Sequence, residues 1–169
     1  MDKRYILIIG IVSICLFNLY ILADYSDIVG SASVDYKNVT FTLPKDFNLL
    51  ETTNNRVQIH NPNFGYITLT YHDDDSKINF QNYFSNIANN SKYIILSNGT
   101  INIENIKVDS VYYQSRLSDG SLNNHSSFLF VKDNTTYEIN MANFDYNDRN
   151  STINNLEIII NSLRPNYKN

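Results

Sequence analysis

The sharpest group of chemically capable side chains in the sequence is His72-Asp73-Asp74-Asp75, with Asn79 shortly after it. Carboxylates and an amide could supply part of the oxygen shell that Ca²⁺ requires. The spaced acidic pattern of a calcium loop, with its central glycine, is absent. The alternative is a solvated turn whose negative charges favour the N-terminus of a following helix. Asp73, Asp74 and Asp75 therefore stay weak metal candidates, and no metal is assigned.

The three histidines, His60, His72 and His125, do not form a predicted site. His60 begins a turn and His72 ends the returning strand, so the pair is expected at opposite ends of a hairpin rather than around a transition metal. The single cysteine, Cys15, lies in an apolar N-terminal segment, and no G-x-S-x-G or H-E-x-x-H motif occurs. We expect a non-catalytic protein without a cofactor. A carboxylate site that carries no motif stays open as a third hypothesis.

Tyrosine is the best indication of binding, with 13 in the chain. A tyrosine ring offers flat, amphipathic contact area for a protein or a glycan. The alternative is that most of these rings pack between sheet and helix with the hydroxyl at the edge. The interaction candidates are Tyr66, Tyr112, Tyr113 and Tyr146, with Tyr137 considered beside them.

Charge argues against nucleic acid as a partner. The formal net charge is −4, and the basic residues are scattered rather than arranged in a stripe that could meet a phosphate backbone. The lone cysteine leaves the remainder of the chain without an internal disulfide. We expect a protein of the cell envelope as the partner, and as an alternative a small ligand, a glycan or Ca²⁺.

Residues 5–23 form an apolar segment without Asp, Glu, Lys, Arg or Pro. As a helix this segment would be about 28 Å long, close to the hydrocarbon thickness of a bilayer. Lys3 and Arg4 precede it and Asp24 and Asp27 follow it, which predicts a cytoplasmic N-terminus. We expect a retained, single-pass membrane anchor, and as the alternative a signal peptide whose cleavage releases a secreted protein.

The expected organisation follows from that segment. Residues 1–4 would be cytoplasmic, 5–23 the transmembrane anchor, 24–35 a polar stalk around Gly30-Ser31, and 36–165 one extracytoplasmic domain. This length suffices for one domain with a core of its own and is too short for two.

Alternating apolar residues predict a series of antiparallel strands. The expected strands cover residues 39–43, 56–60, 65–71, 92–97, 100–103, 105–117, 126–132 and 135–142, and the strand 105–117 is expected to be interrupted or bulged near Asp109-Ser110. Asn98-Gly99 and Asp133-Asn134 are read as tight hairpin turns. Residues 47–50 are expected to form a loop.

Two segments follow a helical period instead. Phe80, Tyr83, Phe84 and Ile87 share one face, with Asn79 as the predicted N-cap. The second apolar stripe begins near Ser151, ends before Pro165 and consists of Ile153, Leu156, Ile159, Ile160 and Leu163. Helices that cover a mostly antiparallel sheet define an α+β fold.

The order of these elements carries a family resemblance. Its main features are the opening phrase Phe41-Thr42-Leu43-Pro44-Lys45-Asp46-Phe47, the helix 80–87, the meander Phe128-Leu129-Phe130 then Tyr137-Glu138-Ile139-Asn140, and the closing segment 158–165. Together they resemble the PsbP-like superfamily over about residues 34–165. The resemblance implies a curved antiparallel sheet flanked by helices, and non-catalytic roles in binding or complex assembly. It transfers no site residue to this chain.

Overall fold

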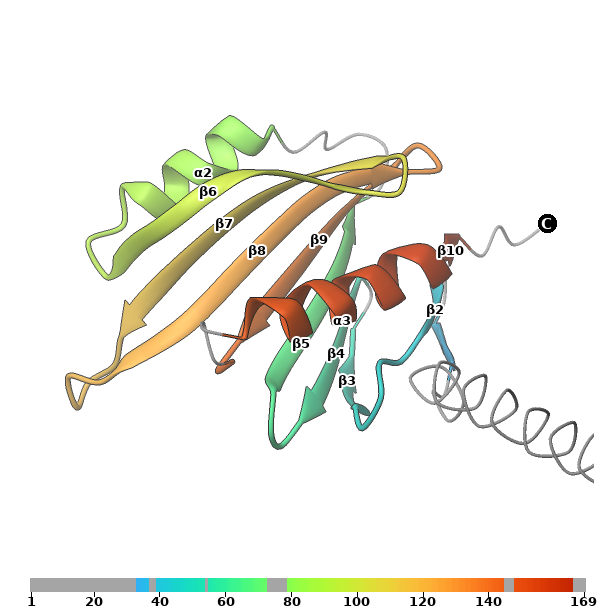
Figure 1. The fold of residues 1–169 in the computed structure, drawn as a ribbon, viewed down its shortest axis with the longest axis horizontal. Coiled ribbons are helices and arrows are strands. Elements are labelled where there is room, and N and C mark those ends of the chain that lie inside the picture. Colours follow the sequence, from blue (N-terminus) through green and yellow to red (C-terminus); the bar gives the residue numbers. More distant parts are fainter. Residues whose placement is uncertain (1–32, 37–38, 54, 73–78, 145–147, 166–169) are drawn as a thin grey trace, which may run out of the picture.

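The computed structural model describes residues 33–36, 39–53, 55–72, 79–144 and 148–165 (Figure 1). The predicted anchor 5–23, the acidic run Asp73–Asp75 and Tyr146 lie outside these residues. Among the helices that are described, none has the length and apolarity needed to span a membrane.

Seven antiparallel strands form the main sheet in the order β3-β4-β5-β9-β8-β7-β6. The strands are β3 (Asn48–Thr52), β4 (Arg56–Asn61), β5 (Gly65–His72), β6 (Tyr93–Ile103), β7 (Ile106–Arg116), β8 (Leu122–Lys132) and β9 (Thr135–Ala142). A second sheet joins β1 (Ser33–Tyr36), β2 (Val39–Thr42) and β10 (Arg164–Pro165) in the order β1-β2-β10. The predicted α+β architecture with a mostly antiparallel sheet is confirmed.

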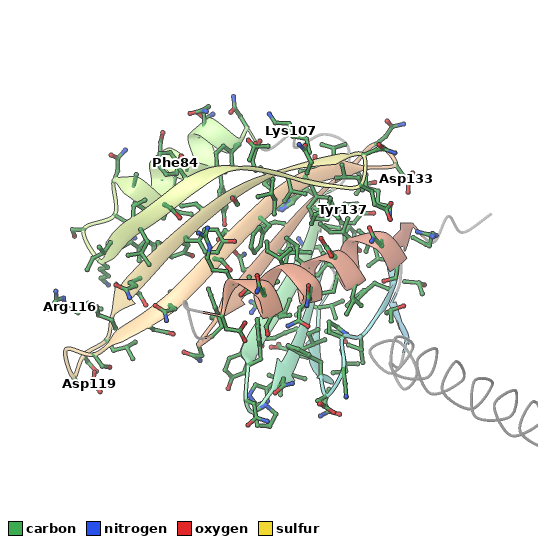
Figure 2. All side chains as sticks on the ribbon, viewed as in Figure 1. Phe84, Lys107, Arg116, Asp119, Asp133 and Tyr137 are labelled. Atoms are coloured by element: carbon green, nitrogen blue, oxygen red, sulfur yellow. The ribbon has the colours of Figure 1, made fainter. Side chains whose placement is uncertain are left out.

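Helix α3 (Arg149–Ser162) covers one face of the main sheet (Figure 1). Its apolar stripe, Leu156, Ile159 and Ile160, is completely buried in one cluster with the inward residues of the strands. Figure 2 shows Tyr137 of β9 directed into the space between α3 and the sheet. This face of the sheet contains the main hydrophobic core.

Helix α2 (Phe80–Ala88) lies on the opposite face, next to β6 and β7. Because side chains alternate along a strand, Tyr112 of β7 faces α3 whereas Val111 and Tyr113 face α2. Ile87 of α2 is buried against these two residues in a smaller apolar cluster. Asn79 caps the helix as predicted, because its side chain accepts a hydrogen bond from the Gln81 amide at 2.8 Å. The sheet is therefore covered on both faces, though unequally.

The predicted turn at Asn98-Gly99 is wrong. Both residues lie inside β6, where Asn98 pairs with Val111 and Gly99 with Ser110, and the chain reverses only after Ile103. Glu104 supplies the positive φ of that reversal, at 50°. The turn at Asp133-Asn134 is confirmed, with φ values of 50° and 61°.

Two further strand predictions are corrected. The expected loop 47–50 contains the start of β3, an exposed edge strand that pairs with β4. The irregularity expected near Asp109 and Ser110 of β7 lies instead on the neighbouring strand, as a bulge between Ile95 and Ser97 of β6. Strand β1 begins at Ser33, so the last residues of the predicted stalk 24–35 belong to a strand that pairs with β2.

Candidate functional site

The tyrosines predicted as contact surface lie in different surroundings. Tyr112 and Tyr113 are only 3% and 9% exposed, on opposite faces of β7. The guanidinium of Arg149 lies 4.8 Å from the centre of the Tyr112 ring. Sheet and helix cover both rings, which is the alternative that the sequence left open for these tyrosines, and a role of either ring in binding a partner remains a prediction. Tyr137 is buried as well.

Tyr66 lies in a more open position than these three. It is half-buried on β5, and its ring lies against that of His60 with 4.4 Å between the centres. His60 pairs with Tyr66 at one end of the β4–β5 hairpin, whereas His72 is at the other end, as the sequence predicted. A role of Tyr66 in binding remains a prediction.

A polar cluster around Glu138 lies on the α2 side of the sheet. The Tyr83 hydroxyl donates to Oε1 of Glu138 at 2.8 Å and lies 3.2 Å from Oδ1 of Asn140. The amide of Asn140 donates to Glu138, and the Ser127 hydroxyl donates to Asn140. The Nε2 atom of His72 is 3.4 Å from Oε2 of Glu138, yet it makes no hydrogen bond within the described residues. Side chains from α2, β5 and β9 thus surround the carboxylate of Glu138, and β8 joins the cluster through Ser127 and Asn140.

The electrostatics of this cluster fix the role of Tyr83. Burial raises the pKa of its phenol far above the usual value, and the negative charge of Glu138 raises this pKa further. Tyr83 therefore keeps its proton and acts as a donor to Glu138. In this state the contact ties α2 to β9 and supplies no base for catalysis.

A second polar contact pairs Ser115 with His125. The Ser115 hydroxyl is 2.8 Å from Nε2 of His125, and the imidazole is stacked on Tyr113 with 5.1 Å between ring centres. Burial lowers the pKa of His125, which favours the neutral ring. A hydrolytic site would also need a third group that orients the histidine, and no carboxylate in the described part of the chain does this. The contact between Ser115 and His125 is therefore a structural hydrogen bond, not part of a hydrolytic site.

Metal-ligating side chains do not converge within the described ranges. No group of three His, Cys, Asp or Glu residues there could hold an ion. The weak candidates Asp73, Asp74 and Asp75 lie outside those ranges, so their role remains a prediction.

A polar groove of about 300 Å³ runs between α3, the β2–β3 loop and the β4–β5 turn. Amide and charged side chains line it together with the rings of Phe47 and Phe64. Asp148 at one end is already engaged as the cap of α3, because its carboxylate accepts from the Ser151 amide at 3.1 Å. The amides of Asn154 and Asn155 leave the groove able to donate and accept hydrogen bonds. Its chemistry suits a small, uncharged polar ligand.

A more apolar groove of about 310 Å³ lies beside the first residue of α2. Phe80, Leu129 and Val131 contribute apolar surface, and Lys107 and Asp109 also line it, with 3.6 Å between Nζ and Oδ1. Ion pairs between exposed groups contribute little stability, so this pair does not define a site.

The α2–β6 surface, defined here as residues 80–88 and 93–103, has an unusual composition. Neither segment contains a charged residue or a proline, although 18% of the chain is charged. Strand β6 is the last strand of the main sheet, and among the described residues only β7 pairs with it. Ile94 and Leu96 on this strand are 41% and 37% exposed. Figure 1 shows α2 (green) and β6 (yellow-green) along the same border of the sheet, and Figure 2 labels Phe84 on α2.

An edge strand that lacks charged residues and proline and exposes apolar side chains is unusual. Natural proteins protect an edge strand with lysine, proline, a bulge or a short length, because its free N–H and C=O groups can pair with another chain. Strand β6 has a bulge but is long and lacks both residue types. Depletion of charge is also the compositional mark of the centre of a protein interface.

The sequence reading missed both the Glu138 cluster and the α2–β6 surface. The polar residues Glu138 and Asn140 alternate with the buried residues Tyr137, Ile139 and Met141, so the second face of β9 was predictable as polar. Which helix would reach that face was not predictable. The β6 edge was hidden by the mistaken turn at Asn98-Gly99, which divided one long strand into two short ones.

Comparison with known proteins identifies solved structures that have a similar fold. No family model and no curated protein sequence matches the chain. Among solved structures, the solution structure of the cyanobacterial PsbP protein CyanoP from Synechocystis matches with a TM-score of 0.52, 9% identity, and coverage of 81% of this chain and 94% of that one. The domain has a PsbP-like fold.

A second solved structure, of a protein from Bacteroides thetaiotaomicron, matches with a TM-score of 0.54 and 11% identity. The match covers 77% of this chain and 46% of the Bacteroides chain, so this chain spans less than half of that protein's length. Likeness at these identities concerns the PsbP-like fold alone.

Proposed function

We propose that this PsbP-like domain is a non-catalytic, extracytoplasmic accessory domain that binds another protein through the α2–β6 surface. The observation that carries the proposal is the 11-residue edge strand β6, which has no charge and no proline and exposes Ile94 and Leu96. An extended segment of a partner can add to such an edge, with main-chain hydrogen bonds giving affinity and neighbouring side chains giving selectivity.

Two further points support the placement of this domain at a membrane. Residues 5–23 are apolar and long enough to act as an anchor, and the basic residues before them favour a cytoplasmic N-terminus. An anchor raises the local concentration of the domain near other membrane proteins, so a modest interface suffices for association. The PsbP-like resemblance implies roles of the same kind.

The experiment is cross-linking and affinity capture of the full chain in membranes of the cells that produce it, read by mass spectrometry. The test variant is Leu96→Lys, because a lysine on an edge strand opposes strand addition. The control is Val131→Lys, which makes the same chemical change at a side chain that is 60% exposed on the interior strand β8.

A partner recovered with the wild type and with Val131→Lys, and lost with Leu96→Lys, is the expected result. Circular dichroism of both variants checks that each one is folded. The same set of captured proteins in all three samples would contradict binding at β6.

A second candidate function is recognition of a small polar ligand, such as a glycan, in the groove beside α3. The observation that favours it is a groove lined by the amides of Asn154 and Asn155 together with the rings of Phe47 and Phe64. The test is a thermal-shift screen of the full chain with neutral oligosaccharides and, separately, with calcium chloride. A shift that disappears in Asn155→Ala and persists in Asn150→Ala, whose side chain is exposed outside the groove, is expected for binding there.

A further inference from the structure

A row of aromatic rings crosses the α2 side of the main sheet and is interrupted on one strand. The residues directly opposite one another on the successive strands β4, β5, β9, β8 and β7 are His60, Tyr66, Ala142, His125 and Tyr113. Opposed residues on neighbouring strands point to the same face of a sheet, so these five side chains stand side by side. The side chain on the middle strand, β9, is a methyl group, whereas the other four are rings.

The rings form one stacked pair on each side of Ala142. His60 and Tyr66 have 4.4 Å between their ring centres, with planes 31° apart. Tyr113 and His125 have 5.1 Å between ring centres, with planes 11° apart. The second face of Tyr66 and of His125 is therefore left on the side of β9. Neighbouring strands are about 5 Å apart, so a gap of about 10 Å separates the strands that carry these two rings. One further ring fits this spacing, at a position above Ala142 that we call the open position.

The open position is accessible from outside the protein. The side chains of His60, Tyr66, Ala142 and His125 are all half-buried rather than buried. Helix α3 covers the other face of the sheet, and α2 lies along β6 and β7 (Figure 1). The part of the row on β4, β5 and β9 lies beyond both of the described helices.

The surroundings of the open position favour an uncharged ligand. The next residues on the same side of β4, β5, β9 and β8 are Gln58, Thr68, Asn140 and Ser127. Among these described positions, and in the row itself, there is no Lys, Arg, Asp or Glu. Burial also lowers the pKa of His125, which favours the neutral imidazole. A phosphate or carboxylate group would therefore find no cation to pair with.

Hydrogen-bonding groups flank the open position along the strand direction. At one end, the hydroxyl of Thr68 accepts from Nε2 of Gln58 at 3.2 Å, and its own hydrogen can still be donated. At the other end, Oδ1 of Asn123 accepts from the main-chain amide of Asn143 at 3.1 Å, and Nδ2 of Asn123 makes no hydrogen bond with a described residue. Apolar walls with polar ends match a ring that has two apolar faces and hydroxyl groups around its edge.

We propose that Tyr66 and His125 hold one pyranose ring of a neutral glycan between them, above Ala142, with its hydroxyl groups bonded to Thr68 and Asn123. A pyranose whose ring hydroxyls are all equatorial, as in glucose, has axial C–H groups on both faces, so both faces suit an aromatic wall. A mannose or galactose ring carries an axial hydroxyl on one face and fits less well. The aromatic side chain of a protein partner would also stack there, but it would leave the polar ends without hydrogen bonds. This site is separate from β6 and from the groove beside α3.

Saturation-transfer NMR of the full chain in lipid nanodiscs tests the proposal. The probes are cellopentaose and chitopentaose, two neutral oligosaccharides with equatorial ring hydroxyls. Because the sugar lies between two rings, protons on both of its faces should receive saturation. Mannopentaose is the matched probe with an axial hydroxyl, and it should bind about tenfold more weakly, since that hydroxyl loses its hydrogen bonds to water against a ring.

Substitution at Ala142 tests the position of the sugar. Ala142→Phe fills the open position with a ring of the chain itself, so it should bind neither probe. The variant should still fold, because aromatic pairs across neighbouring strands stabilise a sheet. The matched control Ala142→Ser keeps the side chain small and should bind as the wild type does. Tyr66→Leu removes one wall and should weaken binding about tenfold. Circular dichroism checks the folding of each variant.

The other possible results overturn the proposal in different ways. Absence of saturation transfer to cellopentaose and to chitopentaose at millimolar concentration would exclude the sugar. Binding that persists in Ala142→Phe and disappears in Asn155→Ala would place the sugar in the groove beside α3. Loss of the captured protein in Ala142→Phe, with no sugar bound by the wild type, would assign the open position to an aromatic side chain of that protein. Capture with Leu96→Lys tests the proposed function at β6 independently of all these results.

Discussion

The hydroxyl of Tyr83 in α2 donates a hydrogen bond to the carboxylate of Glu138 in β9 at 2.8 Å. This bond joins α2 to the middle of the sheet, beyond the strands β6 and β7 that the helix packs against. Because α2 forms part of the proposed binding surface, the contact also fixes the position of that surface.

The first prediction concerns the strength of this contact. Tyr83→Phe removes the donor and leaves Glu138 with one fewer partner in a mostly buried position. Hydrogen bonds to charged groups contribute about 1.5 to 3 kcal/mol, so the unfolding free energy should fall by roughly that amount. Urea denaturation followed by circular dichroism measures the change.

Tyr93→Phe provides the control for this substitution. The Tyr93 ring is also half-buried and lies 5.0 Å from that of Tyr113, but its hydroxyl forms no hydrogen bond with a described residue. The unfolding free energy should therefore change by less than about 0.5 kcal/mol. Equal losses in the two variants would show that the contact with Glu138 adds no stability.

The second prediction follows from the raised pKa of Tyr83. Burial and the charge of Glu138 raise this pKa in the folded state above the usual tyrosine value of about 10. Below pH 10 the group is protonated in both states and its contribution does not vary. Above pH 10 the unfolded chain loses this proton while the folded protein keeps it, so stability falls as pH rises, by about 1.4 kcal/mol per pH unit for one proton.

Tyr83→Phe should remove this part of the alkaline loss. Tyr113, whose pKa burial also raises, contributes a similar slope in both proteins, so the difference between wild type and variant is the measured quantity. Urea midpoints between pH 9 and pH 11 provide it. Parallel curves for the two proteins would mean that Tyr83 ionises in the folded state as easily as in the unfolded chain.

The third prediction distinguishes two glycines. Gly65 has a φ of 117°, and a Cβ atom there would collide with the carbonyl oxygen of Ala142 on β9. Gly99 has open space around its Cα atom and lies within β6. Gly65→Ala should therefore lower the melting temperature markedly, whereas Gly99→Ala should leave it unchanged or slightly higher. A strong loss in Gly99→Ala would argue for the turn that the sequence suggested at this position.

The Asn98-Gly99 error illustrates what local sequence signals can predict. An Asn-Gly pair favours a hairpin because both residues accept positive φ. In this protein the pairing of β6 with all of β7 outweighs that preference, and the chain turns at Glu104, a residue that rarely adopts a φ of 50°. Tertiary pairing decided the position of the turn, and no window of neighbouring residues contains that information.

The elements whose apolar residues follow a clear period were predictable, because burial of one face imposes that period. Ile67, Leu69 and Tyr71 alternate because one face of β5 is buried, and all three lie in the core beside α3. Strand β3 gave no such signal, because an edge strand with both faces exposed has no pattern of burial to follow. The two hydrogen bonds of Tyr83 in the Glu138 cluster join residues 55 and 57 positions apart, which periodicity does not reveal.

The last prediction concerns the core on which α3 packs. Leu156 is completely buried and Glu157, the next residue on the same helix, is exposed. Leu156→Ala should cost about 2 to 5 kcal/mol, since it removes buried methyl groups and leaves a cavity against the sheet. Glu157→Ala should change the unfolding free energy by less than about 0.5 kcal/mol.

Chemical denaturation of both variants measures these differences in unfolding free energy. The location of Leu156 in the fold also makes this variant a test of the proposed function. The Leu156 side chain lies on the face of the sheet opposite α2. A folded Leu156→Ala protein should therefore keep the capture behaviour of the wild type below its melting temperature. Loss of capture in that folded variant would mean that the binding surface depends on α3 rather than on α2 and β6.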